Sequence, residues 1–143
     1  MMIRKIGIIG AMEEEVEALR AKLEHPEKMT RASMDFYSGV LEGREAVIVR
    51  SGIGKVNAGI CTQILADVFH VDAVINTGIA GSLAAQIDIG DIVVSTDTVQ
   101  HDMDATGFGY DPGVIPRMET SCFEADKVLV EAAVAACREA VPE

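Results

Sequence analysis

The chain has 143 residues, of which 49% are hydrophobic and 4% aromatic, and its 23 acidic and 12 basic residues give a net charge of −11. This length predicts one domain, with enough apolar residues to bury a core. The acidic charge excludes nucleic acid and anionic membranes as expected partners, and the scarcity of aromatic rings argues against stacking on single-stranded nucleic acid.

The cysteines and the start of the chain bear on its location. The three cysteines, Cys61, Cys122 and Cys137, form no Cys-x-x-Cys pair. An odd number of cysteines without a secretion signal favours free thiols, buried as core residues, and a cytoplasmic location. The basic start at Arg4 and Lys5 precedes an apolar stretch that is too short for a signal peptide, and no apolar run reaches transmembrane length.

Strand and helix patterns alternate in the first half of the chain. The short apolar segment Lys5–Gly10 ends in glycine and predicts a buried strand. The periodic segment Glu13–Leu23 predicts a helix that ends near the next proline, because proline cannot continue a helix. The segments Asp35–Leu41 and Ala46–Val49 predict a hairpin-like pair across Glu42-Gly43-Arg44.

The alternation continues in the second half. The segment Lys55–Phe69 predicts a helix, Ala73–Thr77 and Asp91–Ser95 predict strands, and Asp126–Ala140 predicts a helix. Strand–helix alternation indicates a largely parallel sheet that is covered on both faces. Residues 100–121 have no clear periodicity, and a loop of that length in a compact domain is usually functional or mobile.

The junction between the first strand and the first helix is unusually acidic, with Glu13, Glu14 and Glu15 after Gly10-Ala11-Met12. Open α/β sheets bind ligands at the carboxyl ends of their strands, and a helix start this acidic repels phosphate but suits holding or deprotonating water. Because Glu15 lies at the edge of the helix's apolar stripe, we expect it to be partly buried, with a raised pKa, and able to act as a base. The alternative is that these acids only favour the helix N-terminus.

Two further turns follow predicted strands. The run Ser51–Val56 lacks both the phosphate-loop spacing and the dinucleotide fingerprint, so it predicts a tight strand-to-helix turn where backbone can approach a ligand. The run Asn76–Ser82 is built of small residues, and its exposed backbone groups could recognise a flat polar ligand. A purely structural turn would explain the glycines of both runs equally well.

The loop around His101 contains Asp102 and Asp104, which are possible metal ligands. A metal site usually needs more ligands at characteristic spacing, so local hydrogen bonds from the Asp side chains are favoured instead. Phe108 in the same loop is either an apolar lid or a loop anchor. No metal and no other cofactor is expected.

Taken together and in this order, these four segments resemble the 5′-methylthioadenosine/S-adenosylhomocysteine nucleosidases of bacteria, which belong to the nucleoside phosphorylase superfamily. The likeness covers the whole chain, and the spacing between the segments matches as well. The matching runs are Gly10–Glu15, Ser51–Val56, Asn76-Thr77-Gly78 with Ala80-Gly81, and His101-Asp102-x-Asp104 with Phe108-Gly109-Tyr110.

The resemblance implies an α/β fold with a mixed, largely parallel central sheet flanked by helices, as in the nucleoside phosphorylases. Residues 1–143 would form a single domain, the N-terminal portion of the family's chain. The family's later segments supply a Met-Glu pair that grips the ribose hydroxyls and an Asp that protonates adenine. We therefore expect a fold that is incomplete at its C-terminus and a missing segment that activity needs.

The resemblance also implies an activity, which is hydrolysis of the N-glycosidic bond of methylthioadenosine and adenosylhomocysteine with release of adenine. Glu15 would bind and activate the attacking water. Six further residues would contact the substrate: Met12 and Ile53 at the ribose and alkylthio group, Ala80 and Gly81 near the base and ribose, and Ala105 and Phe108 across a homodimer interface.

Two positions separate this chain from related proteins. Related phosphorylases carry an arginine where this chain has Asn76, which favours water over phosphate as the nucleophile because phosphate binding requires cations. Ile79 stands where many nucleosidases have a small hydroxyl residue that helps to hold the substrate. Two alternatives stay open: a non-catalytic domain that binds adenine nucleosides, and a related nucleoside hydrolase or phosphorylase with another substrate.

Overall fold

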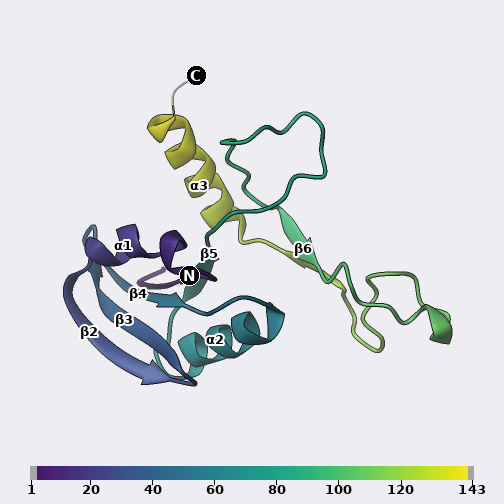
Figure 1. Cartoon of the computed structure of the whole chain (residues 1–143), viewed down its shortest axis with the longest axis horizontal. Coiled ribbons are helices and arrows are strands. Elements are labelled where there is room, and N and C mark those ends of the chain that lie inside the picture. Colours follow the sequence, from purple (N-terminus) through teal and green to yellow (C-terminus); the bar gives the residue numbers. More distant parts are fainter. Residues whose placement is uncertain (1–2, 142–143) are drawn as a thin grey trace. The chain divides into compact units, whose positions relative to one another are not determined.

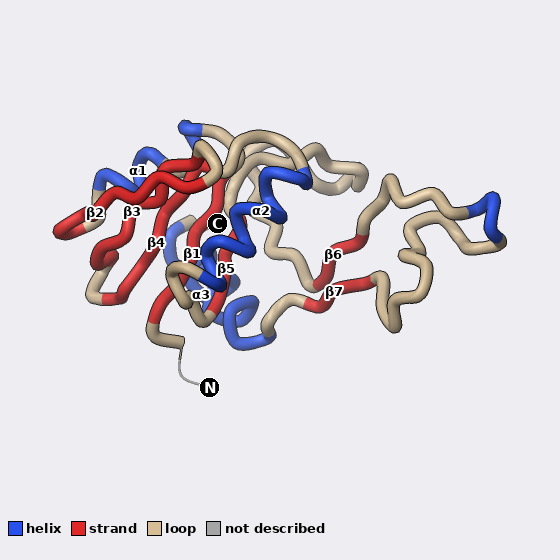
Figure 2. Tube along the Cα trace, turned by 90° about the horizontal axis from the view of Figure 1, so that it is seen from below, coloured by secondary structure: helices blue, strands red, loops and turns tan. Residues whose placement is uncertain are grey.

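The computed structural model describes residues 3–141, so the expectation about the C-terminal end at Glu143 lies outside the described residues. The chain forms two compact units, one ending at Gly81 and one beginning at Ser82. Figures 1 and 2 show the elements of both units.

The first unit is built around a five-stranded sheet in the order β2-β3-β4-β1-β5. Strand β1 pairs parallel with β4 and β5, while β3 pairs antiparallel with β2 and β4, so only β3 opposes the common direction. The predicted mixed, largely parallel sheet is confirmed. The elements are β1 (Lys5–Gly10), the 3₁₀ turn η1 (Glu13–Glu15), α1 (Glu17–Ala21), β2 (Glu24–Arg31), β3 (Met34–Leu41), β4 (Arg44–Arg50), α2 (Lys55–Asp67) and β5 (Ala73–Asn76).

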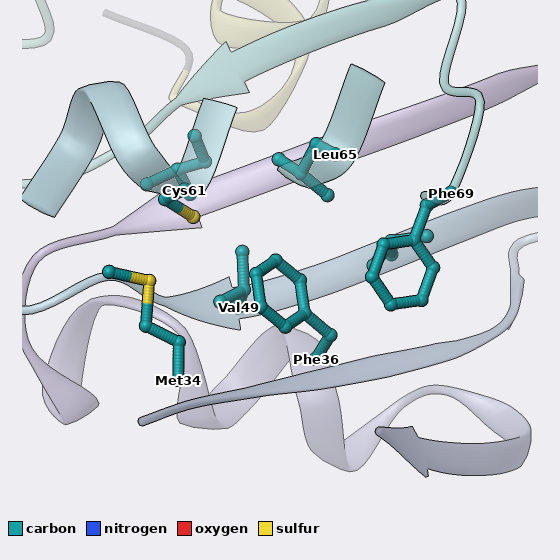
Figure 3. Packing of buried hydrophobic residues seen from close by; sticks show 8 residues of the cluster. Met34, Phe36, Val49, Cys61, Leu65 and Phe69 are labelled. Atoms are coloured by element: carbon teal, nitrogen blue, oxygen red, sulfur yellow. The ribbon is translucent and has the colours of Figure 1, made fainter. Parts of the chain in front are cut away.

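Both faces of this sheet are covered, as the alternation of strands and helices predicts. Successive side chains of a strand point to opposite faces. Ile9 of β1 packs in a cluster with Cys61 and Leu65 of α2, whereas Ile8 packs in a second cluster with Val16, which precedes α1. Figure 3 shows the first cluster, in which the rings of Phe36 and Phe69 stack with centroids 5.0 Å apart.

Leu65 is a sharp test of this core, because its side chain is fully buried over the backbone of Gly7 in β1. We expect Leu65→Ala to lower the free energy of unfolding by about 2–5 kcal/mol, since the cavity adds to the lost apolar burial. Chemical denaturation measures the change. Val56→Ala on the same helix removes a side chain that is 75% exposed and should cost less than about 0.5 kcal/mol. Equal losses in the two variants would contradict this packing.

The predicted helix Glu13–Leu23 is wrong in its continuity, because a 3₁₀ turn and a short α-helix replace it. The break falls at Val16, whose side chain is only 1% exposed and lies in the apolar cluster beneath the turn. Tight 3₁₀ turns are common at helix N-termini. Here burial of Val16 outweighs the regular helical repeat that its sequence neighbours predict.

Strand β2 was not predicted, and it explains the position of Pro26. The helix already ends at Ala21, and Pro26 lies within β2 at a register shift between Glu24 and Glu27. β2 is an edge strand and is exposed along its whole length. Proline is tolerated at edge strands and bulges, where its missing N–H breaks no ladder bond.

The second unit contains two short strands that pair antiparallel, β6 (Asp97–Val99) and β7 (Cys122–Glu124), together with the 3₁₀ turn η2 (Thr106–Phe108) and α3 (Lys127–Ala140). The predicted C-terminal helix is confirmed, and Asp126 caps it by accepting a hydrogen bond from the Leu129 N–H at 3.0 Å. The predicted strand Asp91–Ser95 is wrong. Ile92 and Val93 are exposed and Val94 is half-buried, and a strand needs a pairing partner that apolar composition alone does not supply.

The cysteines occupy different environments. Cys61 is a core residue as expected, and burial raises the pKa of its thiol to about 11. Cys122 is exposed and Cys137 is half-buried, so the expectation of a buried core position is wrong for both. The difference follows from their elements, since β7 is exposed along its length and α3 has no buried residue.

Candidate active site

The carboxyl ends of β1, β4 and β5 lie side by side in the first unit, and each continues into one of the turns that the sequence singled out. Hydrogen bonds extend the pairing past the strand ends, from the Ser51 N–H to the Gly10 carbonyl at 2.9 Å and from the Thr77 N–H to the Ile9 carbonyl at 2.9 Å. Ser51 is buried, and its hydroxyl donates to the Gly52 carbonyl at 2.9 Å. Three separate sequence segments therefore share one edge of the sheet.

The Glu15 carboxylate lies among these strand ends and is held by backbone donors from two of the turns. Its Oε2 accepts from the Ala11 N–H at 2.7 Å and from the Met12 N–H at 3.0 Å. Its Oε1 accepts from the Ile79 N–H at 3.1 Å, across 64 residues of sequence. The carboxylate thus ties the turn after β1 to the turn after β5.

Two glycines leave room for this carboxylate. A Cβ built on Gly78 would contact Glu15 Oε1 and would lie 2.7 Å from Glu15 Cδ. A Cβ built on Gly10 would lie 2.9 Å from Glu15 Cβ and 2.6 Å from Val16 Cγ1. All three distances are shorter than van der Waals contact, so a larger residue at either position would displace Glu15 or its neighbour.

The protonation of Glu15 differs from the sequence-based expectation. The side chain is half-buried, as expected, but the predicted rise of its pKa is wrong. Hydrogen bonds from the backbone of Met12 and Ile79 lower the pKa of Glu15 and outweigh the effect of burial, and the Ala11 N–H lowers it further. Donors aimed at a carboxylate favour its charged form. Glu15 is therefore an anion at neutral pH, suited to holding water and to stabilising positive charge.

The other two acids of the turn have different surroundings. Glu13 forms an ion pair with Arg20 of α1, and its Oε2 lies 3.6 Å from Arg50 Nε at the end of β4. Glu14 is exposed to solvent. Of the three acids, Glu15 has its carboxylate among the strand ends, whereas the two arginines around Glu13 come from positions that the sequence pattern does not connect with it.

The predicted substrate-contacting residues of the first unit lie on the same turns. Met12 is half-buried and donates to Glu15 through its N–H, and Ile53 is 75% exposed. Ala80 and Gly81 are exposed in the stretch that follows Ile79. Of these four residues, the structure brings Met12 directly to Glu15.

The run Ser51–Val56 forms the predicted tight turn into a helix. Gly52 and Gly54 have φ of 84° and 102°, values that favour glycine, and α2 begins directly afterwards at Lys55. The Asn57 amide donates back to the Ile53 carbonyl at 2.8 Å and so closes the turn. Ile53 is thereby presented at the tip of a fixed loop.

The remaining candidates lie in the second unit. Ala105 is 7% exposed and precedes η2, while Phe108 within η2 is 87% exposed. Asp104 accepts hydrogen bonds from the Thr106 N–H at 3.0 Å and from the Thr106 hydroxyl at 2.7 Å, which confirms the expected local bonding of this loop. The Thr106 hydroxyl and N–H also lower the pKa of Asp104.

Residues 3–141 contain neither a metal-binding cluster nor a membrane-spanning helix. No group of three or more His, Cys, Asp or Glu side chains within this range is arranged to hold a metal ion. The same range contains no helix with the length and apolar composition that crossing a membrane requires.

The residue that sequence reasoning missed is the backbone donor at Ile79. Its side chain departs from the family pattern and is 84% exposed, but the contact to Glu15 is made by the N–H, which every residue except proline provides. No signal in the sequence could have identified it, because the contact depends on β1 and β5 being neighbours in the sheet.

The fold and site define an α/β protein with an ionised carboxylate at the carboxyl edge of a mostly parallel sheet, where such proteins bind small molecules. Comparison with known proteins assigns the family. Residues 5–143 match the family model described as the phosphorylase superfamily, and the chain belongs to this superfamily.

Two proteins that are similar to this chain in sequence carry the same enzyme name. The chain is 46% identical over 134 residues to the 5′-methylthioadenosine/S-adenosylhomocysteine nucleosidase of Halalkalibacterium halodurans, a match that covers 94% of this chain and 58% of that protein. It is 50% identical over 126 residues to the nucleosidase of the same name from Staphylococcus aureus, covering 88% of this chain and 55% of that protein.

The similar solved structures are also of nucleosidases with this name. The structure of the Neisseria meningitidis nucleosidase in complex with methylthio-immucillin-A superposes with a TM-score of 0.93 at 40% identity, covering 98% of this chain and 60% of that one. The structure of the Colwellia psychrerythraea nucleosidase in complex with adenine superposes with a TM-score of 0.92 at 44% identity, covering 99% of this chain and 58% of that one. The chain thus spans less than two thirds of the length of these relatives.

Proposed function

We propose that this protein hydrolyses the N-glycosidic bond of 5′-methylthioadenosine and S-adenosylhomocysteine and releases adenine. The observation that carries the proposal is the Glu15 carboxylate, fixed at the strand ends by the N–H groups of Ala11, Met12 and Ile79. The names of the most similar proteins supply the substrate class.

In the proposed reaction, water adds to the anomeric carbon of the ribose while the bond from that carbon to adenine breaks, and the added water then loses one proton to the Glu15 carboxylate. The bonding electron pair leaves with adenine, which takes up a proton, and the ribose carries positive charge at the transition state. An anionic Glu15 would stabilise that charge and would orient the water that it holds, since preorganised charge is most effective where opposite charge develops. Its lowered pKa favours these roles over that of a strong base.

The other residues of the proposed site would shape it around the substrate. Met12 and Ile53 would line the ribose and alkylthio region, and Ala80 with Gly81 would lie near the base and ribose. Ala105 and Phe108 would reach the neighbouring site of a homodimer, where an exposed aromatic ring is suited to covering an alkylthio tail. Both units would belong to one domain, and a segment beyond residue 143 would be needed for activity.

A cytoplasmic location is part of the proposal. It rests on the cysteines, since Cys61, Cys122 and Cys137 are all free thiols in this structure. Reducing compartments keep thiols in that state.

Phosphate dependence separates hydrolysis from phosphorolysis. The exposed Asn76 ends β5 where related phosphorylases carry arginine, and Arg50 at the end of β4 lies beside Glu13. We therefore expect the protein, when the segment beyond residue 143 is supplied, to release adenine from methylthioadenosine at the same rate in phosphate-free buffer and in phosphate. Adenine is measured by chromatography, and the sugar product identifies the nucleophile.

Other results would redirect the proposal. Release that requires phosphate and yields a ribose 1-phosphate would indicate a phosphorylase. Tight binding of methylthioadenosine with no release would indicate a non-catalytic nucleoside-binding domain, and release from other nucleosides alone would indicate a related hydrolase.

A further inference from the structure

Glu13 makes the only ion pairs that the acidic turn forms in the described part of the chain. One carboxylate oxygen pairs with the Arg20 guanidinium, which raises the pKa of Arg20, and the other lies 3.6 Å from Arg50 Nε. The three side chains are between 31% and 57% exposed. Glu13 therefore bridges two cations that belong to different elements.

Both arginines are fixed to the body of the unit. Arg50 is the last residue of β4 and pairs in register with Gly10, the residue directly before Ala11. The Arg20 guanidinium lies 4.9 Å from the ring centroid of Tyr37 in β3, a favourable cation–π distance. The bridge thus connects the three-residue turn that contains Glu15 to the sheet on one side and to α1 on the other.

We propose that Glu13 is a positioning residue, which uses its ion pairs with Arg20 and Arg50 to hold the η1 turn so that the Glu15 carboxylate meets its three backbone donors. A single exposed ion pair contributes little to stability. Its role here is geometric, because Glu13 and Glu15 are the two ends of the same short turn. The consequence for catalysis rests on the proposed function, but the effect on Glu15 does not.

The competing explanation is that Val16 positions the turn alone. Its side chain is buried in the cluster with Ile8 and Ile48, directly after Glu15 in sequence. If apolar anchoring suffices, removing the charge of Glu13 will leave the contacts of Glu15 unchanged.

Charge and geometry predict opposite results for Glu13→Gln, and this makes the test decisive. Removing a nearby negative charge, and releasing Arg20 and Arg50, lowers the pKa of Glu15 further. Losing the backbone donors raises that pKa toward the ordinary glutamate value of about 4.3. If Glu13 positions Glu15, the pKa rises despite the loss of repulsion.

The measurement is a carboxyl-detected NMR titration of Glu15 in the purified chain, compared between the wild type and the variants. Glu14→Gln is the matched control, because the exposed Glu14 lies in the same turn and its loss removes the same charge. Glu13→Asp is a second variant, which keeps the charge but shortens the reach to both arginines. We expect the pKa of Glu15 to rise in both Glu13 variants. In the Glu14→Gln control, the pKa of Glu15 should not rise.

An unchanged or lowered Glu15 pKa in Glu13→Asp and Glu13→Gln would overturn the proposal, and if Glu13→Gln does not fold, Glu13→Asp alone decides. Where adenine release is measurable, kcat of Glu13→Gln should fall by about 10- to 100-fold with KM nearly unchanged, since small misplacements of a catalytic group are costly. Failure of the proposed function would appear as absent release by the wild type even when the segment beyond residue 143 is supplied, and it would leave the titration result intact.

Discussion

Replacing Glu15 by Gln is expected to slow adenine release by roughly 10²–10⁴-fold, the range typical for loss of a positioned acid–base group. The amide is neutral, so it cannot stabilise positive charge on the ribose. It also fits the donors poorly. With its oxygen facing the Ala11 and Met12 N–H groups, its NH₂ group faces the Ile79 N–H, and a donor then meets a donor.

The control for this substitution is Glu14→Gln, one residue away on the same turn and exposed to solvent. It removes the same charge without touching the contacts of Glu15, so adenine release should stay near the wild-type rate. Adenine release and circular dichroism should be measured on both variants. A Glu15→Gln protein that folds normally and keeps near-normal turnover would eliminate Glu15 as the catalytic carboxylate.

Replacing Gly78 by Ala is expected to slow adenine release by about 100-fold while leaving the fold intact. The added methyl group would occupy the space of the Glu15 carboxyl group, which lies at the end of a flexible side chain and moves aside cheaply. Its bond from the Ile79 N–H would then be lost. The melting temperature should fall somewhat, because Gly78 has a φ of 159°, a backbone conformation that residues with a Cβ rarely adopt.

Gly59→Ala provides the comparison for this steric effect. Gly59 lies in α2, and a Cβ built on it meets no atom within 4 Å, so the same chemical change occurs in open space. Its adenine release should match that of the wild type. If Gly78→Ala releases adenine as fast as Gly59→Ala does, the close approach of Gly78 to Glu15 is not needed for activity.

The main elements of the first unit could be predicted from local pattern. The buried strand Lys5–Gly10, the hairpin and the helix after Gly54 follow from apolar runs and turn glycines, which act within a few residues of sequence. Strand β2 could not be predicted this way. It carries no buried residue, so its sequence lacks the apolar alternation that marks a strand, and only its pairing with β3 defines it.

In the candidate site, too, some features could be predicted from the sequence and others could not. The chemical type of Glu15 and its place after a buried strand are properties of the sequence. The direction of its pKa is not, because burial and hydrogen bonding act in opposite directions and their balance depends on donors that the fold brings in. The donor at Ile79 and the pairing of Glu13 with Arg50 both join residues far apart in the chain.

The sequence by itself therefore determined the α/β character of this protein, its acidic first turn, its glycine-rich strand ends and its likeness to the nucleosidases. Those features are local in the chain and are encoded by residue type and spacing. The tertiary structure alone decided that three such turns meet at one sheet edge, that Glu15 is ionised, and that Glu13 is paired with two arginines. These depend on strand order and register, which place the ends of β1, β4 and β5 beside one another.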